Sequence, residues 1–321
     1  MPESIEKPFG STVLRLGGEY KDLVVLDADL QRATETQEFA ETFPDRYFNV
    51  GVSEANMIGI AAGLALSGKT VFCGTFSCFI TQRVYDQVAI SVAYTQASVK
   101  LFGFEPALTS GNNGATHQSV MDLAIMRAMP GMTVYDPLDG NEFRALMEYQ
   151  ATHPEPAYVR AFRKTAPLLI DSGDNFEPGK VYTLKQGNDV SIITCGIMLP
   201  YCMEVSEELN NRGISVDLLA TSSIKPLQAE QIIASVKRTH CLVSVENHSI
   251  IGGLGGAICE ILSVNYPVPI IRIGIQDQFG EIGSRDWLFG KFQMDKKAIA
   301  LAAEKAMQLK DKFQESGNAR L

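Results

Sequence analysis

Residues 50–65 read VGVSEANMIGIAAGLA, and the interpretation of the whole chain starts from this stretch. Gly51 allows a tight turn where a short strand ends, and Glu54 then opens an apolar run that is typical of a buried helix. An acidic residue at a helix N-terminus is common and needs no functional role. Residues 51–55 also nearly match the G-x-S-x-G nucleophile elbow, so a hydrolase with Asp and His partners in later loops stays open at this point.

Short β-rich runs alternate with longer helix-like segments on both sides of this stretch. Their order predicts a parallel sheet with helices on both faces, which is a doubly wound α/β domain. The expected strands are residues 23–26, 70–73, 99–102, 133–135 and 157–160, and the expected helices are residues 54–67, 80–94, 119–129 and 140–152.

The alternation stops at residues 167–188, which are rich in Gly, Pro, Ser, Asn and Asp and are interpreted as a domain linker. A first domain is therefore expected over residues 1–166 and a smaller α/β domain over residues 189–321. In the second domain, strands are expected at residues 190–194, 216–219, 241–245 and 270–273, and helices at residues 199–212, 229–237, 254–262 and 296–314.

Composition narrows the class of protein. The formal net charge of −9 over 321 residues argues against nucleic acid and anionic membrane surfaces as main partners. The six cysteines form no C-x-x-C pair and have no His at zinc-ligand spacing, so we expect buried free thiols in a reducing compartment and no metal site made of them. Neither a secretory signal nor an apolar run long enough to span a membrane is visible, and a cytoplasmic location is expected.

Three further loops at expected strand ends carry chemically interesting side chains. Phe76 and Phe79 share a helix face, which is more often core but could stack on a flat heterocycle. His117 ends a polar, glycine-rich loop over residues 110–118, where core packing explains a histidine poorly. Arg160 ends an expected strand and is either a surface side chain or an anion clamp.

Taken in order, these windows resemble one family. Residues 50–65 resemble the pyrimidine-binding signature of transketolases, residues 74–79 (GTFSCF) its next motif and residues 114–118 (GATHQ) a third. Residues 223–227 (SIKPL) and 248–255 (HSIIGGLG) are similar to the family's carboxy-terminal domain. The chain thus resembles the carboxy-terminal half of a thiamine-diphosphate-dependent transketolase: a pyrimidine-binding domain followed by a smaller, mixed-sheet domain.

The resemblance implies roles for five residues at the cofactor and the sugar. Glu54 would hydrogen-bond the ring nitrogen of the cofactor's aminopyrimidine, so that the exocyclic nitrogen can remove the proton from the thiazolium C2. Phe76 and Phe79 would form the aromatic pocket for the pyrimidine, and Asp29 would lie near the cofactor. His117 would contact the hydroxyls of the donor sugar around the bond that is cleaved.

The resemblance also implies a partner. No Gly-Asp-Gly motif followed by a metal-ligating Asn occurs in this chain, and in the family that motif holds the diphosphate through Mg²⁺ or Ca²⁺. A separate amino-terminal subunit would therefore carry the motif and the metal ligands. The expected assembly is an α2β2 heterotetramer built on a homodimer of this chain, inactive without its partner.

Several positions that would bind substrate depart from the family pattern. Arg160 matches a phosphate ligand, but Glu105 stands where a phosphate-binding His is usual and Asn113 where an Asp is usual. Gln82 replaces an aromatic, and Lys7 is the nearest match to an amino-terminal Arg. A carboxylate at position 105 would repel a phosphate, which suggests a substrate other than the pentose and hexose phosphates of the pentose phosphate pathway.

Three alternatives stay open. The first is the β subunit of the decarboxylating component of a 2-oxo-acid dehydrogenase, which has similar length and domain order. The second is an enzyme like 1-deoxyxylulose-phosphate synthase, a family that shares the motif at residues 114–118. The third is an inactive interaction subunit, which the joint presence of Glu54, Phe76, Phe79, His117 and Arg160 disfavours.

Overall fold

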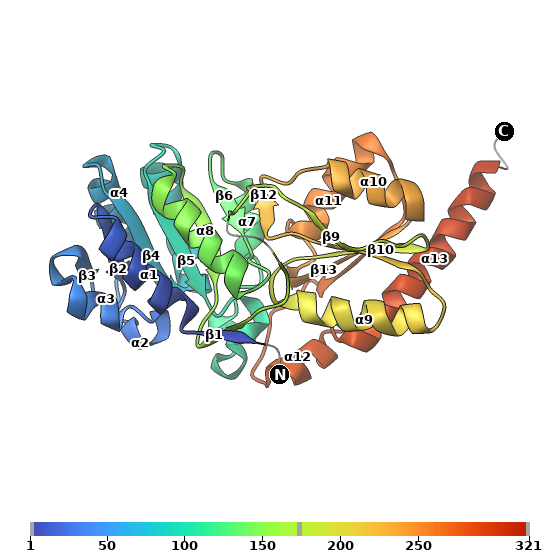
Figure 1. The fold of residues 1–321 in the computed structure, drawn as a ribbon, viewed down its shortest axis with the longest axis horizontal. Helices are drawn as coiled ribbons and strands as arrows, with labels where there is room; N and C mark the ends of the chain where they lie inside the picture. The colour runs from blue at the N-terminus through green and yellow to red at the C-terminus, as the bar shows by residue number, and fades with distance from the viewer. Residues whose placement is uncertain (1–2, 172–174, 319–321) are drawn as a thin grey trace.

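The structure is a computed structural model that describes residues 3–171 and 175–318. Residues 172–174 of the predicted linker, and residues 1–2 and 319–321 at the ends of the two predicted domains, lie outside the described residues. Two sheets, each flanked by helices, lie side by side along the long axis of the molecule (Figure 1).

The first sheet has seven strands in the order β12-β6-β7-β5-β4-β2-β3. All neighbouring strands are parallel except β12, which pairs antiparallel with β6. Strands β2, β5 and β7 are buried along their whole length, as expected for a parallel sheet with helices on both faces. The strands are β2 (Leu23–Asp27), β3 (Tyr47–Asn49), β4 (Thr70–Phe76), β5 (Val99–Phe104), β6 (Thr133–Tyr135), β7 (Ala157–Ala161) and β12 (Ser223–Lys225).

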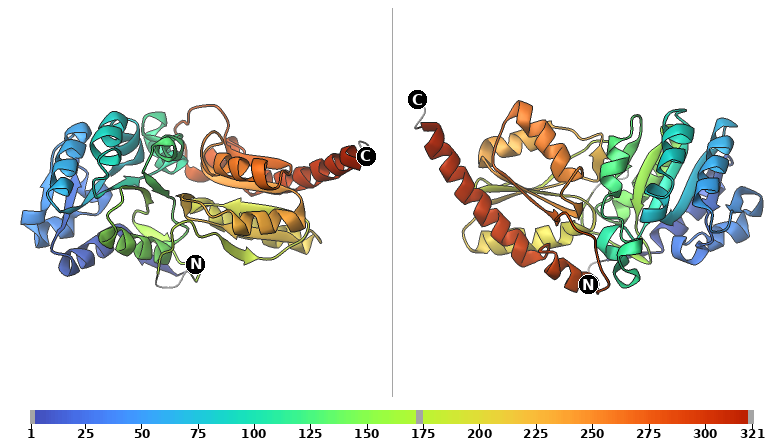
Figure 2. Two further views of the ribbon diagram at one scale, coloured as in Figure 1. Left: turned by 90° about the horizontal axis from the view of Figure 1, so that it is seen from above. Right: turned by 180° about the vertical axis from the view of Figure 1, so that it is seen from behind.

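Helices cover both faces of this sheet (Figure 2). One face packs a core of aromatic and aliphatic side chains, including Phe9, Phe39 and Phe143, beneath α1, α3 and α8. The other face packs Met57, Val88 and Leu123 beneath α4, a π-helix and α7. The helices are α1 (Pro8–Glu19), α2 (Gln31–Thr34), α3 (Gln37–Thr42), α4 (Glu54–Leu66), α5 (Ser77–Thr81), α6 (Tyr85–Gln87), the π-helix (Val88–Ala93), α7 (Asp122–Ala128) and α8 (Gly140–Thr152), with 3-10 helices at Pro44–Arg46, Ala107–Asn113 and Ala115–His117.

The helix expected over residues 80–94 is wrong as a single element. The chain forms α5, leaves helical geometry at Val84 (φ −120°, ψ 19°), and re-enters through α6 and the π-helix. No Gly or Pro marks the break in the sequence, so the residue pattern carried no local signal for it. Arg83 lies immediately before this break.

The second sheet has five strands in the order β14-β13-β10-β11-β9. Only β9 runs antiparallel to its neighbour, so the sheet is mixed and the predicted fold class, an α/β chain with two sheets, is confirmed. Helices α9 and α13 pack on one face, and α10 and α11 on the other. The elements are β9 (Tyr182–Lys185), β10 (Val190–Thr194), β11 (Val216–Ala220), β13 (Leu242–Ser249), β14 (Ile270–Ile275), α9 (Leu199–Asn211), α10 (Glu230–Thr239), α11 (Leu254–Asn265), α12 (Arg285–Lys291), α13 (Lys296–Asn318) and a 3-10 helix at Gly196–Met198.

The two halves of the chain are joined more closely than a linker implies. Strand β9 lies inside the predicted linker, so residues 182–185 belong to the second sheet rather than to a connection. Strand β12 comes from the second half of the chain but completes the first sheet. A small ribbon of β1 (Ser4–Glu6) and β8 (Thr165–Pro167) closes the first half. Domain boundaries at residues 166 and 189 stay a prediction.

Two expectations from composition can be compared with the fold. All six cysteines are free thiols, and Cys259 alone is not fully buried. Burial raises the pKa of Cys202 to about 12, so this thiol stays protonated at neutral pH. Within residues 3–171 and 175–318, no helix combines the length and the apolar character needed to cross a membrane.

Candidate active site

The carboxyl ends of the parallel strands β2, β4, β5, β6 and β7 lie along one edge of the first sheet. Ligands bind at this edge in open parallel sheets because the loops that follow each strand converge there. The segments after β2, β4, β5 and β7 carry Asp29, Phe79, His117 and Arg163, respectively.

Glu54 is placed by the turn that the sequence predicted. Gly51 adopts φ +72°, a conformation that favours glycine, and the chain enters α4 three residues later. Glu54 is the first residue of α4 and is only 4% exposed. Its Oε1 accepts a hydrogen bond from Nη1 of Arg83 at 2.8 Å, which neutralises a carboxylate that burial would otherwise penalise.

Three half-buried rings meet beside this pair. Phe76 ends β4, Phe79 lies in α5, and their ring centroids are 6.0 Å apart. The His117 ring packs edge-on against both, with centroids 5.8 Å from Phe76 and 5.2 Å from Phe79. The guanidinium carbon of Arg83 lies 4.0 Å from the centroid of the Phe79 ring, so Arg83 links the aromatic cluster to Glu54.

This arrangement is suited to a flat, nitrogen-bearing heterocycle. The guanidinium of Arg83 is itself planar, stacks on Phe79 and donates to Glu54. An aminopyrimidine offers the same combination of a flat face and an edge that a carboxyl group can hydrogen-bond. The residues present therefore fit the pyrimidine of thiamine diphosphate, provided that Arg83 moves aside.

Asp29 follows β2 in a left-handed conformation, with φ 64°. Its backbone N–H donates to Oδ1 of Asn49, and the Asn49 side-chain amide donates to Oδ1 of Asp29. Asn49 also accepts from the N–H of Gly51, so Asp29 supports the turn that leads to Glu54. Among the described residues, no hydrogen bond or ion pair joins Asp29 to the aromatic cluster.

The loop from Glu105 to His117 follows β5 and consists of two short 3-10 helices. The carbonyl of Pro106 accepts from the side chain of Asn247, whose side-chain oxygen accepts from the N–H of Leu108. The loop is thus held by the second half of the chain. Asn113 is exposed and donates to the Ser110 hydroxyl at 3.2 Å.

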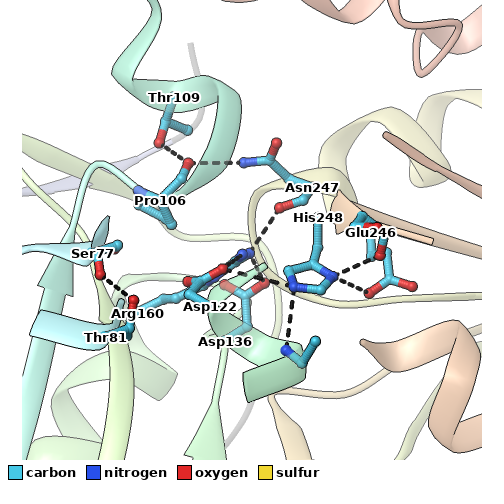
Figure 3. Close-up of polar contacts among 12 residues, drawn as sticks. Ser77, Thr81, Pro106, Thr109, Asp122, Asp136, Arg160, Glu246, Asn247 and His248 are labelled. Carbon is cyan, nitrogen blue, oxygen red and sulfur yellow. Dashed lines mark hydrogen bonds and ion pairs between the residues drawn. The ribbon is translucent and has the colours of Figure 1, made fainter. Parts of the chain in front are cut away.

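Arg160 is buried, so its interpretation as a surface side chain is wrong. Its guanidinium donates to both oxygens of Asp122, at 2.9 and 2.7 Å, and to Asp136 and the Asn247 carbonyl, each at 3.0 Å (Figure 3). Burial favours the neutral form of Asp122, but the ion pair with Arg160 outweighs it and lowers the Asp122 pKa. Four of the five guanidinium N–H groups are therefore used within the chain, and a role in binding substrate phosphate stays a prediction.

A buried histidine adjoins this ion pair. His248 donates from Nδ1 to the Ser249 carbonyl and accepts at Nε2 from the N–H of Ala124, a pattern that requires the neutral ring. Burial lowers its pKa to about 4, in agreement with that pattern. Next to it, Glu246 accepts from the first N–H groups of α11, and burial raises its pKa to about 7. Both groups join elements within the chain rather than face a ligand.

Glu105 and Arg163 form an ion pair at 2.8 Å, and their side chains are 21% and 28% exposed. They line a cavity of about 990 Å³ between the two halves of the chain. The two sequence positions follow neighbouring parallel strands, β5 and β7, which explains why they meet.

Sequence reasoning missed two residues of this edge, Arg83 and Arg163. Arg83 lies four residues after Phe79, a spacing that places side chains together on a helix and could have indicated it. Arg163 lies in the loop after Arg160, where a second basic residue was a usable signal. Their partners Glu54 and Glu105 are distant in the sequence, so the pairs themselves were not predictable.

Two family models together match most of the chain. Residues 4–167 match the family model "Transketolase, pyrimidine binding domain" and residues 179–299 match "Transketolase, C-terminal domain". The 6-deoxy-6-sulfo-D-fructose transketolase subunit of Clostridium sp. (strain MSTE9) is 43% identical over 90% of each chain. A subunit of the apulose-4-phosphate transketolase of Phocaeicola vulgatus is 37% identical over 92% of this chain and 95% of its own.

A solved structure is similar over nearly the whole length. It is described as a split gene transketolase, an inactive beta4 tetramer, and superposes with a TM-score of 0.85 at 36% identity, over 94% of this chain and 97% of that one. The two relatives named above are thus separate transketolase subunits, and a pyrimidine-binding domain implies thiamine diphosphate. The chain belongs to the transketolase family.

Proposed function

We propose that this chain is the carboxy-terminal subunit of a two-subunit transketolase, which transfers a two-carbon ketol unit from a ketose to an aldose. One observation supports the proposal: the buried Glu54 carboxylate pairs with the planar Arg83 guanidinium, which stacks on Phe79 in an aromatic cluster that also contains His117. This is the arrangement needed to hold an aminopyrimidine by its edge and its face.

Glu54 is the proton-handling group of this site. Its carboxyl oxygen, which accepts from Arg83 in the free subunit, would instead hydrogen-bond the pyrimidine ring nitrogen. Phe76 and Phe79 would support the ring by stacking and exclude water from it. When bound, thiamine diphosphate supplies the carbanion chemistry of ketol transfer, and the protein orients it.

His117 is proposed to orient the donor sugar. Its Nδ1 lies 2.9 Å from the Thr116 hydroxyl, which leaves Nε2 for a sugar hydroxyl. Asn113, exposed in the same loop, is proposed to reach the sugar as well, and Asp29 to support the cofactor-binding turn. Arg160 lines the cavity between the two halves of the chain, and its one remaining N–H group is proposed to contact the substrate phosphate.

The assembly is proposed to contain a second kind of subunit. A Gly-Asp-Gly motif is absent from the sequence, so the diphosphate and its Mg²⁺ or Ca²⁺ would be held by a partner chain. Relatives that are themselves named as transketolase subunits support this partner, and so does the similar structure described as an inactive beta4 tetramer.

A surface for self-association is available on α4 and the adjacent π-helix. Ile60, Leu66, Ile90 and Tyr94 are between 36% and 83% exposed there, although α4 is apolar on all sides. A helix that is apolar all round is expected to be buried, so a second copy of this chain is proposed to cover this face in an α2β2 complex.

The donor sugar is the part of the proposal that relatives constrain least. One relative is named for a sulfonated ketose and another for a phosphorylated one. Both sugars are therefore test donors, with ribose 5-phosphate and glyceraldehyde 3-phosphate as test acceptors.

The experiment is co-expression with a candidate chain that carries the Gly-Asp-Gly motif, followed by a ketol-transfer assay with thiamine diphosphate and Mg²⁺. We expect activity that requires both chains and that falls by a factor of about 100 or more in Glu54→Gln. Glu230→Gln is the matched control, because Glu230 is also the first residue of a helix, α10, but is exposed. Equal activity of wild type and Glu54→Gln would refute the role of Glu54.

A further inference from the structure

The cavity between the two halves of the chain lies at the same edge of the first sheet as the proposed active site. It opens over the carboxyl ends of β5, β6 and β7, where Glu105, Asp136 and Arg163 line it. The second half of the chain adds Tyr201 and Lys296 to the opposite wall. At about 990 Å³, it is large enough for a sugar.

A single loop connects the cavity with the aromatic cluster. The loop begins at Glu105, whose side chain lines the cavity, and ends at His117, whose ring contacts Phe76 and Phe79. Strands β4 and β5 are parallel neighbours in the sheet, so the aromatic cluster after β4 and the cavity after β5 lie along the same edge. A ketose whose reacting end lies at His117 would extend its far end toward this cavity.

The cavity wall is electrically balanced. Five basic and five acidic side chains line it. Arg163 pairs with Glu105 at 2.8 Å, Arg160 with Asp136 at 3.0 Å, and Lys296 with Glu204. Arg285 lies 3.8 Å from Asp286, so among the described basic side chains of the wall only Lys164, which is exposed, has no carboxylate partner.

Glu105 is held in place by its backbone. It adopts φ 52°, a left-handed conformation that non-glycine residues rarely adopt. Its side chain is only 21% exposed and reaches back over the cavity to Arg163. The carboxylate is therefore a built part of the wall rather than a loose surface charge.

We propose that the Glu105–Arg163 pair makes this cavity a subsite for a ketose end that carries at most one negative charge, and that it discriminates against a phosphate dianion. The inference rests on the proposed function and adds the substrate class. A dianion needs a surplus of cations, whereas the Arg163 guanidinium is already paired with the Glu105 carboxylate, which would repel a dianion.

Glu105→Gln tests the proposal, because it keeps the shape of the side chain and frees Arg163. In the assembled complex, the ratio of kcat/KM for fructose 6-phosphate to kcat/KM for fructose should rise about tenfold or more, as expected for a charge-assisted hydrogen bond gained and a repulsion removed. Glu260→Gln is the matched control: Glu260 on α11 pairs with Arg127 on α7, neither residue lines the cavity, and the change should leave the ratio unchanged.

A second readout does not depend on catalysis. Inorganic phosphate should raise the Tm of the isolated Glu105→Gln chain but not of wild type or Glu260→Gln, since ligand binding stabilises the folded state. Adding Arg163→Met to Glu105→Gln should abolish the shift. If Glu105→Gln folds poorly, Arg163→Met is tested alone. It should lower the ratio of kcat/KM for fructose 6-phosphate to kcat/KM for fructose below the wild-type ratio.

Two results would overturn the inference: an unchanged ratio with no phosphate-dependent Tm shift in Glu105→Gln, or a ratio that falls in this variant. A complex that transfers ketol from no donor would instead refute the proposed function. In that case the phosphate-dependent Tm shifts of wild type and Glu105→Gln still show whether the Glu105–Arg163 pair discriminates against a phosphate dianion.

Discussion

The strongest consequence of the structure concerns Arg160, which sequence reasoning assigned to substrate phosphate. The change Arg160→Met would leave Asp122 and Asp136 buried without their cation, and the Asn247 carbonyl without its donor. Removing one partner of a buried ion pair costs about 3–5 kcal/mol. With an unfolding entropy of about 2.1 cal/mol/K per residue, each kcal/mol lowers the Tm of this 321-residue chain by about 1.5 °C, so a loss of about 4–7 °C is expected.

The assay is scanning calorimetry of the isolated chain, in which no substrate or cofactor contributes. Adding Asp122→Asn and Asp136→Asn to Arg160→Met removes the unpaired charges and should restore more than half of the lost Tm. Arg160→Lys keeps one charge but not the two-pronged contact with Asp122, and should fall between wild type and Arg160→Met. A wild-type Tm for Arg160→Met, with only a raised KM for phosphorylated donors, would refute the structural role and support the phosphate role.

Three further outcomes are expected. Burial raises the pKa of Glu142 from 4.5 in the unfolded chain to about 7, so its protonated form stabilises the fold below pH 4.5 and that contribution is lost as the pH rises through 7. In urea unfolding, the free energy of unfolding of Glu142→Gln should therefore gain about 2–3 kcal/mol relative to wild type between pH 5 and pH 8. Parallel pH profiles of the two proteins would contradict this. Arg83→Met frees the Glu54 carboxylate and should tighten thiamine diphosphate binding by the complex about two- to tenfold in calorimetric titration, whereas weaker binding would mean that Arg83 helps to hold the ring. Ile60→Glu on α4 should shift the chain toward monomer in sedimentation, and Val264→Glu, at an exposed position on α11, should not.

The alternation of strands and helices was predictable because it follows from local physics. Strands buried on both faces must be apolar along their length, and the covering helices must be amphipathic or apolar. Strand β6 (Thr133–Tyr135) and helix α8 (Gly140–Thr152) accordingly have the expected bounds. The left-handed turn at Gly51 was predictable for a similar reason, since few other residues tolerate it.

Pairings between distant residues were not predictable in this way. Strand β12 leaves the second half of the chain to pair with β6, and β9 pairs with β11 from within the predicted linker. Edge strands of three or four residues carry too few side chains for their pattern to reveal a partner. Their placement depends on which backbone edges remain unpaired after the rest of the fold has formed.

Residue types and their spacing were enough to indicate the α/β class, the motifs that resemble transketolases, and the candidate residues Glu54, Phe76, Phe79 and His117. These depend on residue type and spacing, which a chain carries in any conformation. Only the tertiary structure decided which charges meet: Arg83 with Glu54, Arg163 with Glu105, and Arg160 with Asp122. Electrostatic energy depends on distance and burial, and both are set by how the elements around the first sheet pack rather than by order along the chain.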